Sequence, residues 1–445
     1  MDFKQTADKV ESLLRSRPLD GWEIFQVASR NLSIEVKEQK VDSFTCSQPV
    51  GVSVRVLTAG RMGFSFSTSL DEADLGRMID NALVGAENQT ADQFLGFPLP
   101  ESYPDIPGMF DEGLAQVDEG EKVERAAALE RLTLAADPRV KRVRKASYGE
   151  SSFEVAIRNS LGVAGSYRGT SVSASVSAVA EEGGESQMGW DFGFSTAFGG
   201  VHVEEIARTA ATKAAGLLGA RKGPTIRCPA LLDNYVATEI LEVLAPAFLA
   251  ENVQKGKSLL AGRAGERLFA PCLRIRDDGT LPGGMATAPF DGEGVPRRNT
   301  VLVEEGILRG FLYDGYCARK EGRISTANAT RGGVKAPPRM GMNNFFIENG
   351  EAPFDSLLAG VGRGILITEV MGMHTANPIS GDFSVGAAGF LVDNGAVTAP
   401  VKGIAIAGNI LDIFRSVEGV GNDLRFFGAV GSPSLLIAAL DVSGE

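Results

Sequence analysis

Residues 140–195 read VKRVRKASYGESSFEVAIRNSLGVAGSYRGTSVSASVSAVAEEGGESQMGWDFGFS, and this stretch sets the expected fold. Small and β-branched residues alternate along it with polar ones, and a period of two is typical of half-buried strands. Turn residues interrupt the alternation at Asn159-Ser160 and at Gly183-Gly184. The predicted strands are 140–151, 152–159, 162–182 and 186–195. We therefore predict an antiparallel meander with one solvent-facing side.

Helices are predicted on both sides of this meander, at about 119–135 and 203–218. The preceding part of the chain has the same order: a helix at 3–17 stopped by Pro18, a set of short strands, and a second helix. The short strands are 23–29, 32–37, 41–45, 50–57 and 62–67. Ser69 with Glu72 three residues later indicates a capping box that opens the second helix, which runs to Glu87. The repeated order suggests an approximate internal duplication.

Four prolines make residues 94–107 an extended excursion. The segment is interpreted either as a lid or interface arm, or as a surface crossing between the halves of a domain. The best domain boundary is Gly219 to Pro224. We predict an N-terminal α+β domain at 1–222 and a β-rich C-terminal domain at 223–445.

The C-terminal domain is predicted to open with a strand at 225–232 and a helix that starts at Asp233. Pro246 lies inside this helix and should kink or end it. Further strands are predicted at 299–304, 307–314, 344–348, 364–370, 384–394, 396–407 and 434–441. Asp393-Asn394-Gly395 indicates a tight hairpin. The fold class is therefore α+β, with two domains of mostly antiparallel sheet and flanking helices.

The composition excludes some functions. The net charge of −12 argues against sequence-independent binding of nucleic acid, which needs excess lysine and arginine. The basic run Lys141-Arg142-Val143-Arg144-Lys145 is interpreted as a solvated strand face. The first residues lack the apolar core of a signal peptide, and no stretch approaches the length of a membrane span. We expect a cytoplasmic protein with no membrane contact.

The residues that usually hold catalytic metals are scarce. The chain has two histidines, His202 and His374, far apart in sequence, and four cysteines without a Cys-x-x-Cys pair. No conventional metal site and no cofactor are therefore expected, although a site made only of carboxylates stays open. His202 is expected to face solvent beside a helix start. Gly256-Lys257-Ser258 resembles the end of a phosphate-binding loop, but Glu251 replaces a required glycine.

Residues 372–384 gather an imidazole, an amide, a carboxylate and several hydroxyl groups in one loop. His374, Asn377, Asp382 and Ser384 are therefore candidate substrate-binding residues. The alternative is a turn whose Asn377 and Asp382 side chains bond their own backbone. The sequence favours neither interpretation.

Several runs together resemble the PmbA/TldD family over essentially the whole chain. They are Asn252-Val253-Gln254-Lys255-Gly256-Lys257-Ser258, Asp291-Gly292-Glu293-Gly294, Gly310-Phe311-Leu312-Tyr313-Asp314, Met342-Asn343-Asn344-Phe345-Phe346-Ile347, the His374 loop, Pro400-Val401 through Asn409, and Gly421-Asn422-Asp423-Leu424. The resemblance is to the metal-free type of this family, called PmbA or TldE and historically linked to modulation of DNA gyrase. Ala327 departs from it, because a glycine is expected there.

The resemblance implies where the metal of the other type would lie. In TldD-type members a His-Glu-x-x-x-His helix and a later cysteine hold zinc. Those ligand positions fall here on Leu241, Pro246 and Val430, and the glutamate position falls on Glu242. The resemblance thus implies a vestigial site without zinc and without a catalytic residue.

The implied function is that of a non-catalytic subunit. It would pair with a TldD-type zinc peptidase chain and help to degrade or trim small unstructured peptides. The two chains would share a cleft in which exposed strand edges can pair with an extended peptide. Two alternatives stay open: a stand-alone peptidase with a non-zinc nucleophile, and a peptide-binding or regulatory protein without hydrolysis. A homodimer is also compatible with the sequence.

Overall fold

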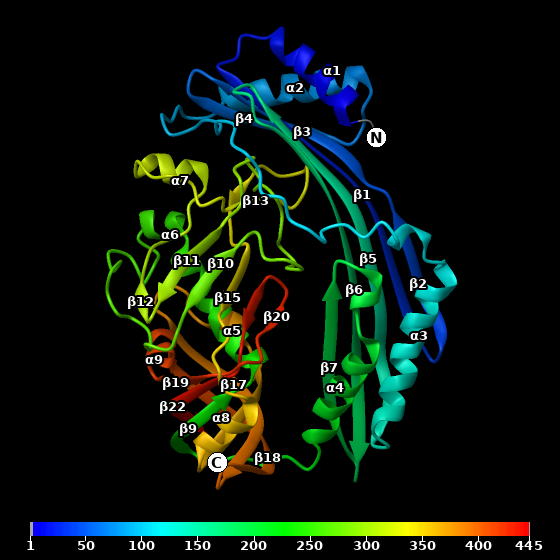
Figure 1. Cartoon of the computed structure of the whole chain (residues 1–445), viewed down its shortest axis with the longest axis vertical. Helices are drawn as coiled ribbons and strands as arrows, with labels where there is room; N and C mark the ends of the chain where they lie inside the picture. The colour runs from blue at the N-terminus through cyan, green and yellow to red at the C-terminus, as the bar shows by residue number, and fades with distance from the viewer. Residues whose placement is uncertain (1–2, 445) are drawn as a thin grey trace.

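The computed structural model describes residues 3–444 and contains three large sheets (Figure 1). The first sheet has the order β4-β3-β1-β5-β6-β7, and β2 pairs with the second half of β1; all its pairs are antiparallel. Its strands are β1 (Gly21–Lys37), β2 (Lys40–Ser47), β3 (Val50–Thr58), β4 (Arg61–Ser67), β5 (Val140–Asn159), β6 (Ala164–Glu182) and β7 (Glu185–Ser195). The predicted meander is confirmed, but 23–29 with 32–37 and 140–151 with 152–159 form single long strands.

Helices cover the first sheet on one side. They are α1 (Phe3–Arg15), α2 (Glu72–Glu87), α3 (Glu119–Ala136) and α4 (Val203–Gly216), with the short 3-10 turns η1 (Leu114–Gln116) and η2 (Phe198–Gly200). The apolar side of β5 and β6 packs under α3 and α4, whereas Ser173, Ser175 and Ser177 on the other side stay partly exposed. This alternation explains the period of two in the sequence.

The capping box at Ser69 is a wrong prediction. Helix α2 starts at Glu72 with Asp71 as N-cap, and no side chain caps it. The Ser69 hydroxyl instead accepts from the Asp71 backbone N–H, while the Ser67 hydroxyl accepts from the Ser69 N–H. Local turns therefore use the hydroxyl that the sequence pattern assigned to the helix.

Two further sheets make up the second half of the chain. One has the order β12-β11-β10-β15-β21-β20, antiparallel except between β15 and β21. The other has the order β19-β22-β9-β16-β17-β18-β8, and β18 also pairs with β22, which closes five of these strands into a barrel. Most of its pairs are antiparallel, in agreement with the predicted fold class.

The bounds of these strands are β8 (Arg221–Lys222), β9 (Ile226–Leu232), β10 (Ile275–Asp278), β11 (Asn299–Glu304), β12 (Ile307–Leu308), β15 (Asn344–Ile347), β16 (Gly364–Met371), β17 (Asp382–Asp393), β18 (Ala396–Asn409), β19 (Val417–Val420), β20 (Arg425–Phe427), β21 (Val430–Ser432) and β22 (Leu435–Ser443). A separate hairpin pairs β13 (Ala329–Thr330) with β14 (Arg339–Met340). The predicted hairpin at Asp393-Asn394-Gly395 is confirmed, with positive φ at Asn394 and Gly395. The predicted strand at 307–314 is wrong beyond Leu308.

Helices of the second half are short. They are α5 (Asn234–Leu244), η3 (Ala245–Phe248), α6 (Ala250–Gln254), α7 (Gly315–Lys320), α8 (Phe354–Val361), η4 (Met373–Thr375) and α9 (Ile410–Arg415). The carboxylate of Asp233 caps α5 by accepting from the Val236 N–H at 2.8 Å. The α-helix ends before Pro246, as predicted, because proline cannot donate the next backbone hydrogen bond. Within residues 3–444 no helix has both the length and the apolar character needed to cross a membrane.

A buried ion network joins the two halves of the chain. The Arg55 side chain on β3 donates to Glu23 on β1 at 2.5 and 3.0 Å and to Glu293 at 3.1 Å. Arg331 donates to the same Glu23. Glu293 belongs to the Asp291-Gly292-Glu293-Gly294 run, so this sequence motif is a structural connection between the halves.

The proline-rich segment 94–107 makes a second connection. It runs across the middle of the molecule in Figure 1 and carries no helix or strand. Arg319 on α7 donates to the Phe94 carbonyl at 2.6 Å, and the Tyr103 hydroxyl donates to the Gly294 carbonyl at 3.0 Å. The segment is thus a strap between the two halves of the chain, and these contacts fit an interface arm better than a surface crossing between the halves of one domain.

Ala327 provides a stability prediction, because it has φ +63 and is fully buried. A side chain with a Cβ is strained in this left-handed conformation, which explains why a glycine is expected there. We expect Ala327→Gly to raise the free energy of unfolding by about 1 kcal/mol. Urea denaturation of both proteins would measure the change, and a loss of stability would show that the buried methyl group outweighs the strain.

Candidate functional site

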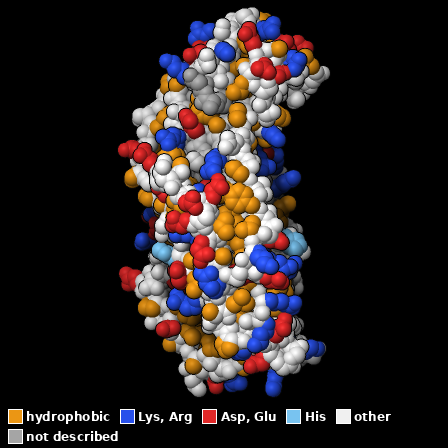
Figure 2. All heavy atoms as spheres, turned by 90° about the vertical axis from the view of Figure 1, so that its right-hand side faces the viewer, with side chains coloured by type: hydrophobic (Ala, Val, Ile, Leu, Met, Phe, Trp, Pro, Cys, Tyr) orange, Lys and Arg blue, Asp and Glu red, His pale blue; other side chains and the backbone are white. Residues whose placement is uncertain are grey.

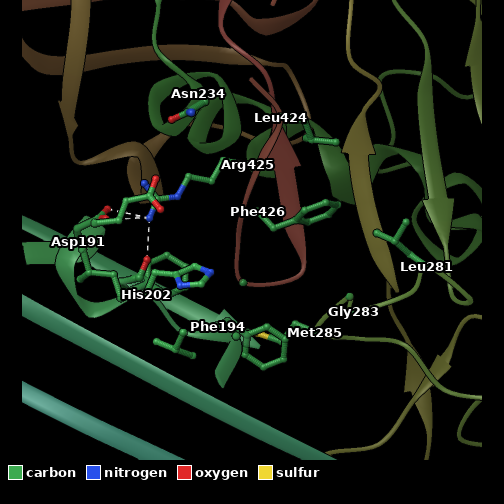
Figure 3. Close-up of a pocket in the computed structure, with 18 of the residues that line it drawn as sticks. Asp191, Phe194, His202, Asn234, Leu281, Gly283, Met285, Leu424, Arg425 and Phe426 are labelled. Atoms are coloured by element: carbon green, nitrogen blue, oxygen red, sulfur yellow. Dashed lines mark hydrogen bonds and ion pairs between the residues drawn. The ribbon is translucent and has the colours of Figure 1, made fainter. Parts of the chain in front are cut away.

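A cavity of about 720 Å³ lies between the two halves of the chain. One wall comes from β7 and from the start of α4, including Asp191, Phe194 and His202. The opposite wall comes from the loop 281–285, from Asn234 at the start of α5 and from residues 423–428 around β20. Figure 3 shows Arg425 reaching towards Asp191, with Phe194, Met285 and Phe426 on the far side. The cavity therefore combines charged groups with apolar and aromatic surface, as ligand sites do.

Arg425 bridges the two walls. Its guanidinium donates to the Asp191 carboxylate at 3.0 Å and to the Phe192 carbonyl at 2.7 Å. Asp191 is almost fully buried, and Lys213 on α4 lies 3.7 Å from its second oxygen. Two cations, one from each half, thus compensate one buried carboxylate.

Four aromatic rings surround this ion pair. Trp190 and Phe192 come from β7, Tyr235 from α5 and Phe427 from β20; the Trp190 and Tyr235 ring centroids are 5.3 Å apart. The Lys213 ammonium lies 5.5 Å from the Trp190 ring, and the Arg425 guanidinium lies 5.1 Å from the Phe427 ring. The cluster is only partly covered, since Trp190 remains 38% exposed. The cluster therefore presents aromatic ring surface and cation–π contacts where the two halves of the chain meet.

A group of carboxylates lies beside the cluster. The pKa of Asp233 is raised from 3.8 to about 7, mainly because burial disfavours its charged form; Lys213 opposes the rise, and Asp423 and Glu369 add to it. Burial also raises the pKa of Glu239 and of Glu369. Within residues 3–444 no three His, Cys, Asp or Glu side chains come together in a metal-binding arrangement.

The raised pKa of Asp233 gives a pH prediction. Its folded pKa lies above its unfolded value of about 3.9, so its contribution to stability is complete below about pH 4 and is lost as the pH rises through about 7. Asparagine can cap α5 in the same way. We expect Asp233→Asn to flatten the decline of the melting temperature between about pH 4 and pH 7. If the melting temperatures of the parent protein and the variant fall with pH at the same rate, the prediction is wrong.

The candidate residues of the His374 loop lie elsewhere. His374, Asn377, Asp382 and Ser384 are exposed, and none of them lines the cavity described above. The Asn377 side chain accepts from the backbone N–H groups of Ile379 and Ser380, and Asp382 accepts from Asn409 at 3.0 Å. The Asn377 bonds fit the self-satisfied turn that the sequence allowed, whereas the Asp382 carboxylate bonds the side chain of Asn409 rather than its own backbone. A substrate contact at these residues stays a prediction.

His202 is the N-cap residue of α4, and it is exposed, as the sequence predicted. Its ring, however, faces the cavity (Figure 3). Sequence reasoning missed Asp191, Arg425, Lys213 and the aromatic cluster. The alternation of Trp190, Phe192 and Phe194 along β7 was a usable signal for an aromatic strand face.

The basic run at 141–145 belongs to β5 and carries ion pairs. Lys145 pairs with Glu35, and Arg142 pairs with Glu181 at 3.1 Å. Figure 2 views the molecule from the side of β2 and α3, and there acidic and basic side chains are interspersed. The basic run is thus part of a solvated strand face, as the sequence predicted.

Comparisons with known proteins match the whole described fold. Domain models of one family match residues 22–86, 112–218 and 225–444, described as PmbA/TldA metallopeptidase domain 1, central domain and C-terminal domain. An uncharacterized protein of Methanocaldococcus jannaschii is 31% identical over 96% of this chain and 98% of its own length.

The chain belongs to the PmbA/TldD metallopeptidase family.

Other PmbA/TldD relatives agree with this assignment. The metalloprotease PmbA of Escherichia coli O157:H7 is 29% identical over 97% of this chain and 94% of its own. A Thermotoga maritima structure described as a modulator of a DNA gyrase is 29% identical, with a TM-score of 0.91 over 99% of this chain and 100% of that one. TldE from Thermococcus kodakarensis shares the fold, with a TM-score of 0.91 and 23% identity over 99% of each chain.

Proposed function

We propose that this chain is the zinc-free subunit of a two-chain peptidase of the PmbA/TldD family. Its partner would be a TldD-type chain that carries the metal and the catalytic water, and the substrate would be a small unstructured peptide. This chain would contribute walls of a shared cleft. The assignment to a metallopeptidase family supports the peptide substrate.

The observation that carries the proposal is the kind of residue on α5 and β21 at the positions where the TldD type is expected to hold zinc. Leu241 on α5 and Val430 on β21 are buried in the same apolar core, so these two positions offer hydrocarbon where zinc needs nitrogen or sulfur. Pro246 lies in the 3-10 turn after α5, and its ring nitrogen has no lone pair free to bind a metal. The residues present therefore do not fit the zinc that the TldD type is expected to hold, and no catalytic step is assigned to Glu242, on the exposed side of α5.

The test compares this chain alone, a TldD-type chain from the same cells alone, and the two together. We expect cleavage of an unfolded peptide only in the mixture, at least about 100-fold above either chain alone, because one chain supplies the metal and the other completes the cleft. A chelator should abolish it. Elemental analysis should find zinc only in the TldD-type chain, and the two chains should elute together from a sizing column.

Other results would identify the alternatives. Cleavage by this chain alone that a chelator stops would overturn the proposal. Chelator-insensitive cleavage lost in one Ser, Thr or Cys variant would indicate a stand-alone peptidase. Peptide binding without turnover, even in the mixture, would indicate a binding protein. The sizing column would also show whether the isolated chain forms a homodimer.

A further inference from the structure

A second cavity, of about 560 Å³, lies between the two halves of the chain and shares no lining residue with the first. Its walls come from β3, β4, the end of α2 and the strap, and from α6, α7 and the chain around β14. Figure 1 shows α6 and α7 below the β4 end of the first sheet. The volume lies in the range of small-molecule sites, roughly 300–1,000 Å³. The proposed function makes no use of this cavity.

Strand β4 supplies apolar surface to this second cavity. A Cβ at Gly63 would overlap the backbone of α2, so Gly63 faces the helix. Because neighbouring residues of a strand face opposite sides, Met62 and Phe64 point away from α2, and both line the cavity. Further apolar residues of the wall are Leu95, Pro337, Pro338 and Met340. The cavity can therefore accept an apolar side chain.

Arg319 on α7 brings a positive charge to the second cavity. Its Nε donates to the Phe94 carbonyl at 2.6 Å and its Nη2 to the Gly96 carbonyl at 3.3 Å. Both acceptors are neutral, and within residues 3–444 no carboxylate forms an ion pair with this guanidinium. Its Nη1 takes part in neither bond and lies 3.1 Å from the position of a Cβ at Gly315. The two carbonyls thus hold the guanidinium in place, and its charge is available to an anionic group.

Asp314, the N-cap residue of α7, brings the opposite charge. Its Oδ1 accepts from the Cys317 N–H at 2.7 Å, and its side chain lines the same cavity. Burial raises the pKa of this carboxyl above its ordinary value; the Cys317 N–H opposes the rise, and the Glu293 and Glu251 carboxylates add to it. In the described part of the chain no lysine or arginine forms an ion pair with Asp314. An ammonium group beside Asp314 would stabilise its charged form.

We propose that the second cavity binds a small zwitterion, a free α-amino acid or a dipeptide with apolar side chains. The carboxylate of the ligand pairs with Arg319, its ammonium group pairs with Asp314, and its side chain packs against Met62 and Phe64. This site goes beyond the proposed function, since it needs neither the shared cleft nor the partner chain. Peptide cleavage releases molecules of this class, so the ligand is a product of the reaction that the complex is proposed to perform.

The overall charge of the lining favours a zwitterion over an inorganic anion. Acidic and basic side chains are equal in number around the cavity: Glu251, Glu293, Asp314, Arg55, Arg319 and Arg339. Arg55 is already occupied by Glu23 and Glu293. A phosphate ion would gain from the arginines but would be repelled by the carboxylates. A ligand that carries both charges is attracted by both groups.

The first test uses the unaltered full-length chain and isothermal titration calorimetry. The probes are leucine, the dipeptide leucyl-leucine, leucinamide, which lacks the carboxylate, and N-acetyl-leucine, which lacks the ammonium group. We expect at least one of the two zwitterions to bind, and the tighter one identifies the amino acid or the dipeptide as the preferred ligand. Leucinamide and N-acetyl-leucine should each bind about 10-fold more weakly than leucine or worse, because each loses one charged contact.

Three results of this titration would overturn the proposal. They are the absence of binding by both zwitterions, equal affinities for leucine and its two blocked forms, and binding of inorganic phosphate as tight as that of the zwitterions. The first would show that the cavity holds only water. The second would show that the apolar wall alone holds the ligand, and the third that the arginines form a simple anion site.

Two substitutions place the ligand in the second cavity. Arg319→Gln removes the positive charge, so leucine and leucinamide should then bind equally. Asp314→Asn removes the negative charge but can still cap α7, so leucine and N-acetyl-leucine should then bind equally. Arg323→Gln is the matched control, since it removes an exposed arginine that pairs with Glu321 at 3.3 Å, and it should preserve both differences. If the Arg319 and Asp314 variants also preserve them, the ligand binds elsewhere and the proposal is wrong.

Thermal melts of the variants show that each one folds, and the titration of the unaltered chain decides the proposal if one of them does not. The experiment needs neither the TldD-type chain nor cleavage. Cleavage by the two-chain mixture without binding of either zwitterion would overturn the second site and leave the proposed function standing. Zwitterion binding as expected, with no cleavage by the mixture, would overturn the subunit role and leave the second site standing.

Discussion

Replacement of Glu23 by glutamine should lower the free energy of unfolding by about 3–5 kcal/mol, because it leaves two buried arginines with one carboxylate. Glu23 is fully buried and bonds both Arg55 and Arg331. Burial lowers the pKa of Arg331 to about 10, and the nearby Arg55 charge also lowers it, while Glu23 raises it. Loss of the Glu23 charge removes the interaction that keeps both cations stable in this environment.

Guanidinium denaturation would measure this change. The matched control is Glu124→Gln, which removes an exposed carboxylate that pairs with Arg131 at 2.8 Å and should cost less than about 1 kcal/mol. Because the network connects β1 and β3 with Glu293 and Arg331, the Glu23 variant should also loosen the contact between the halves, measurable as faster amide exchange around residues 291–295. A cost as small as that of the control would mean that water enters the network.

The second large effect is expected at Gly63, on β4. A Cβ there would lie 1.8 Å from the Ala82 carbonyl oxygen and 2.8 Å from the Ala86 nitrogen, both backbone atoms of α2. Backbone cannot rotate away as a side chain can, so α2 would have to move off the sheet. We expect Gly63→Ala to cost about 3 kcal/mol or more.

Gly76→Ala is the control for this prediction, since it adds the same methyl group to α2 itself. Apart from the backbone of its own helix and its two chain neighbours, no atom lies within 4 Å of the new Cβ, so only helix propensity changes, and the variant should be about 1 kcal/mol more stable. Thermal melts followed by circular dichroism would compare the three proteins. Equal melting temperatures for the two variants would show that α2 does not rest on Gly63.

Much of the fold follows from local patterns in the sequence. Alternation predicted strands throughout 140–195, although it divided β5 in two; Asn394-Gly395 predicted a hairpin, and Pro246 predicted the end of α5. The short helices α7 and α8 were missed, because six or eight residues give too little periodicity to recognise. The wrong capping prediction at Ser69 shows that a local turn can use a hydroxyl group that the sequence pattern assigns to a helix.

The candidate site divides in the same way. The sequence indicated the family and the absence of the zinc ligands of its TldD type. It also indicated the His374 loop as a candidate site, from the density of polar groups alone. It did not indicate the cavity, whose two walls are joined by Arg425 and Asp191, 234 positions apart. In the sequence, an exposed polar loop and a polar cavity wall have the same composition, and only their contacts in the folded structure distinguish them.

By itself, the sequence determined which residues are available for chemistry and which side of each strand or helix is apolar. Two histidines and four scattered cysteines, and apolar residues at 241 and 430, are properties of the chain that no folding can alter. The tertiary structure alone decided which strands lie at the edges of the sheets and which charged side chains lie together in the buried ion network. The physical reason is that a period of two or 3.6 reports burial along one element, whereas strand order and ion pairing such as Glu23 with Arg331 depend on contacts between distant elements.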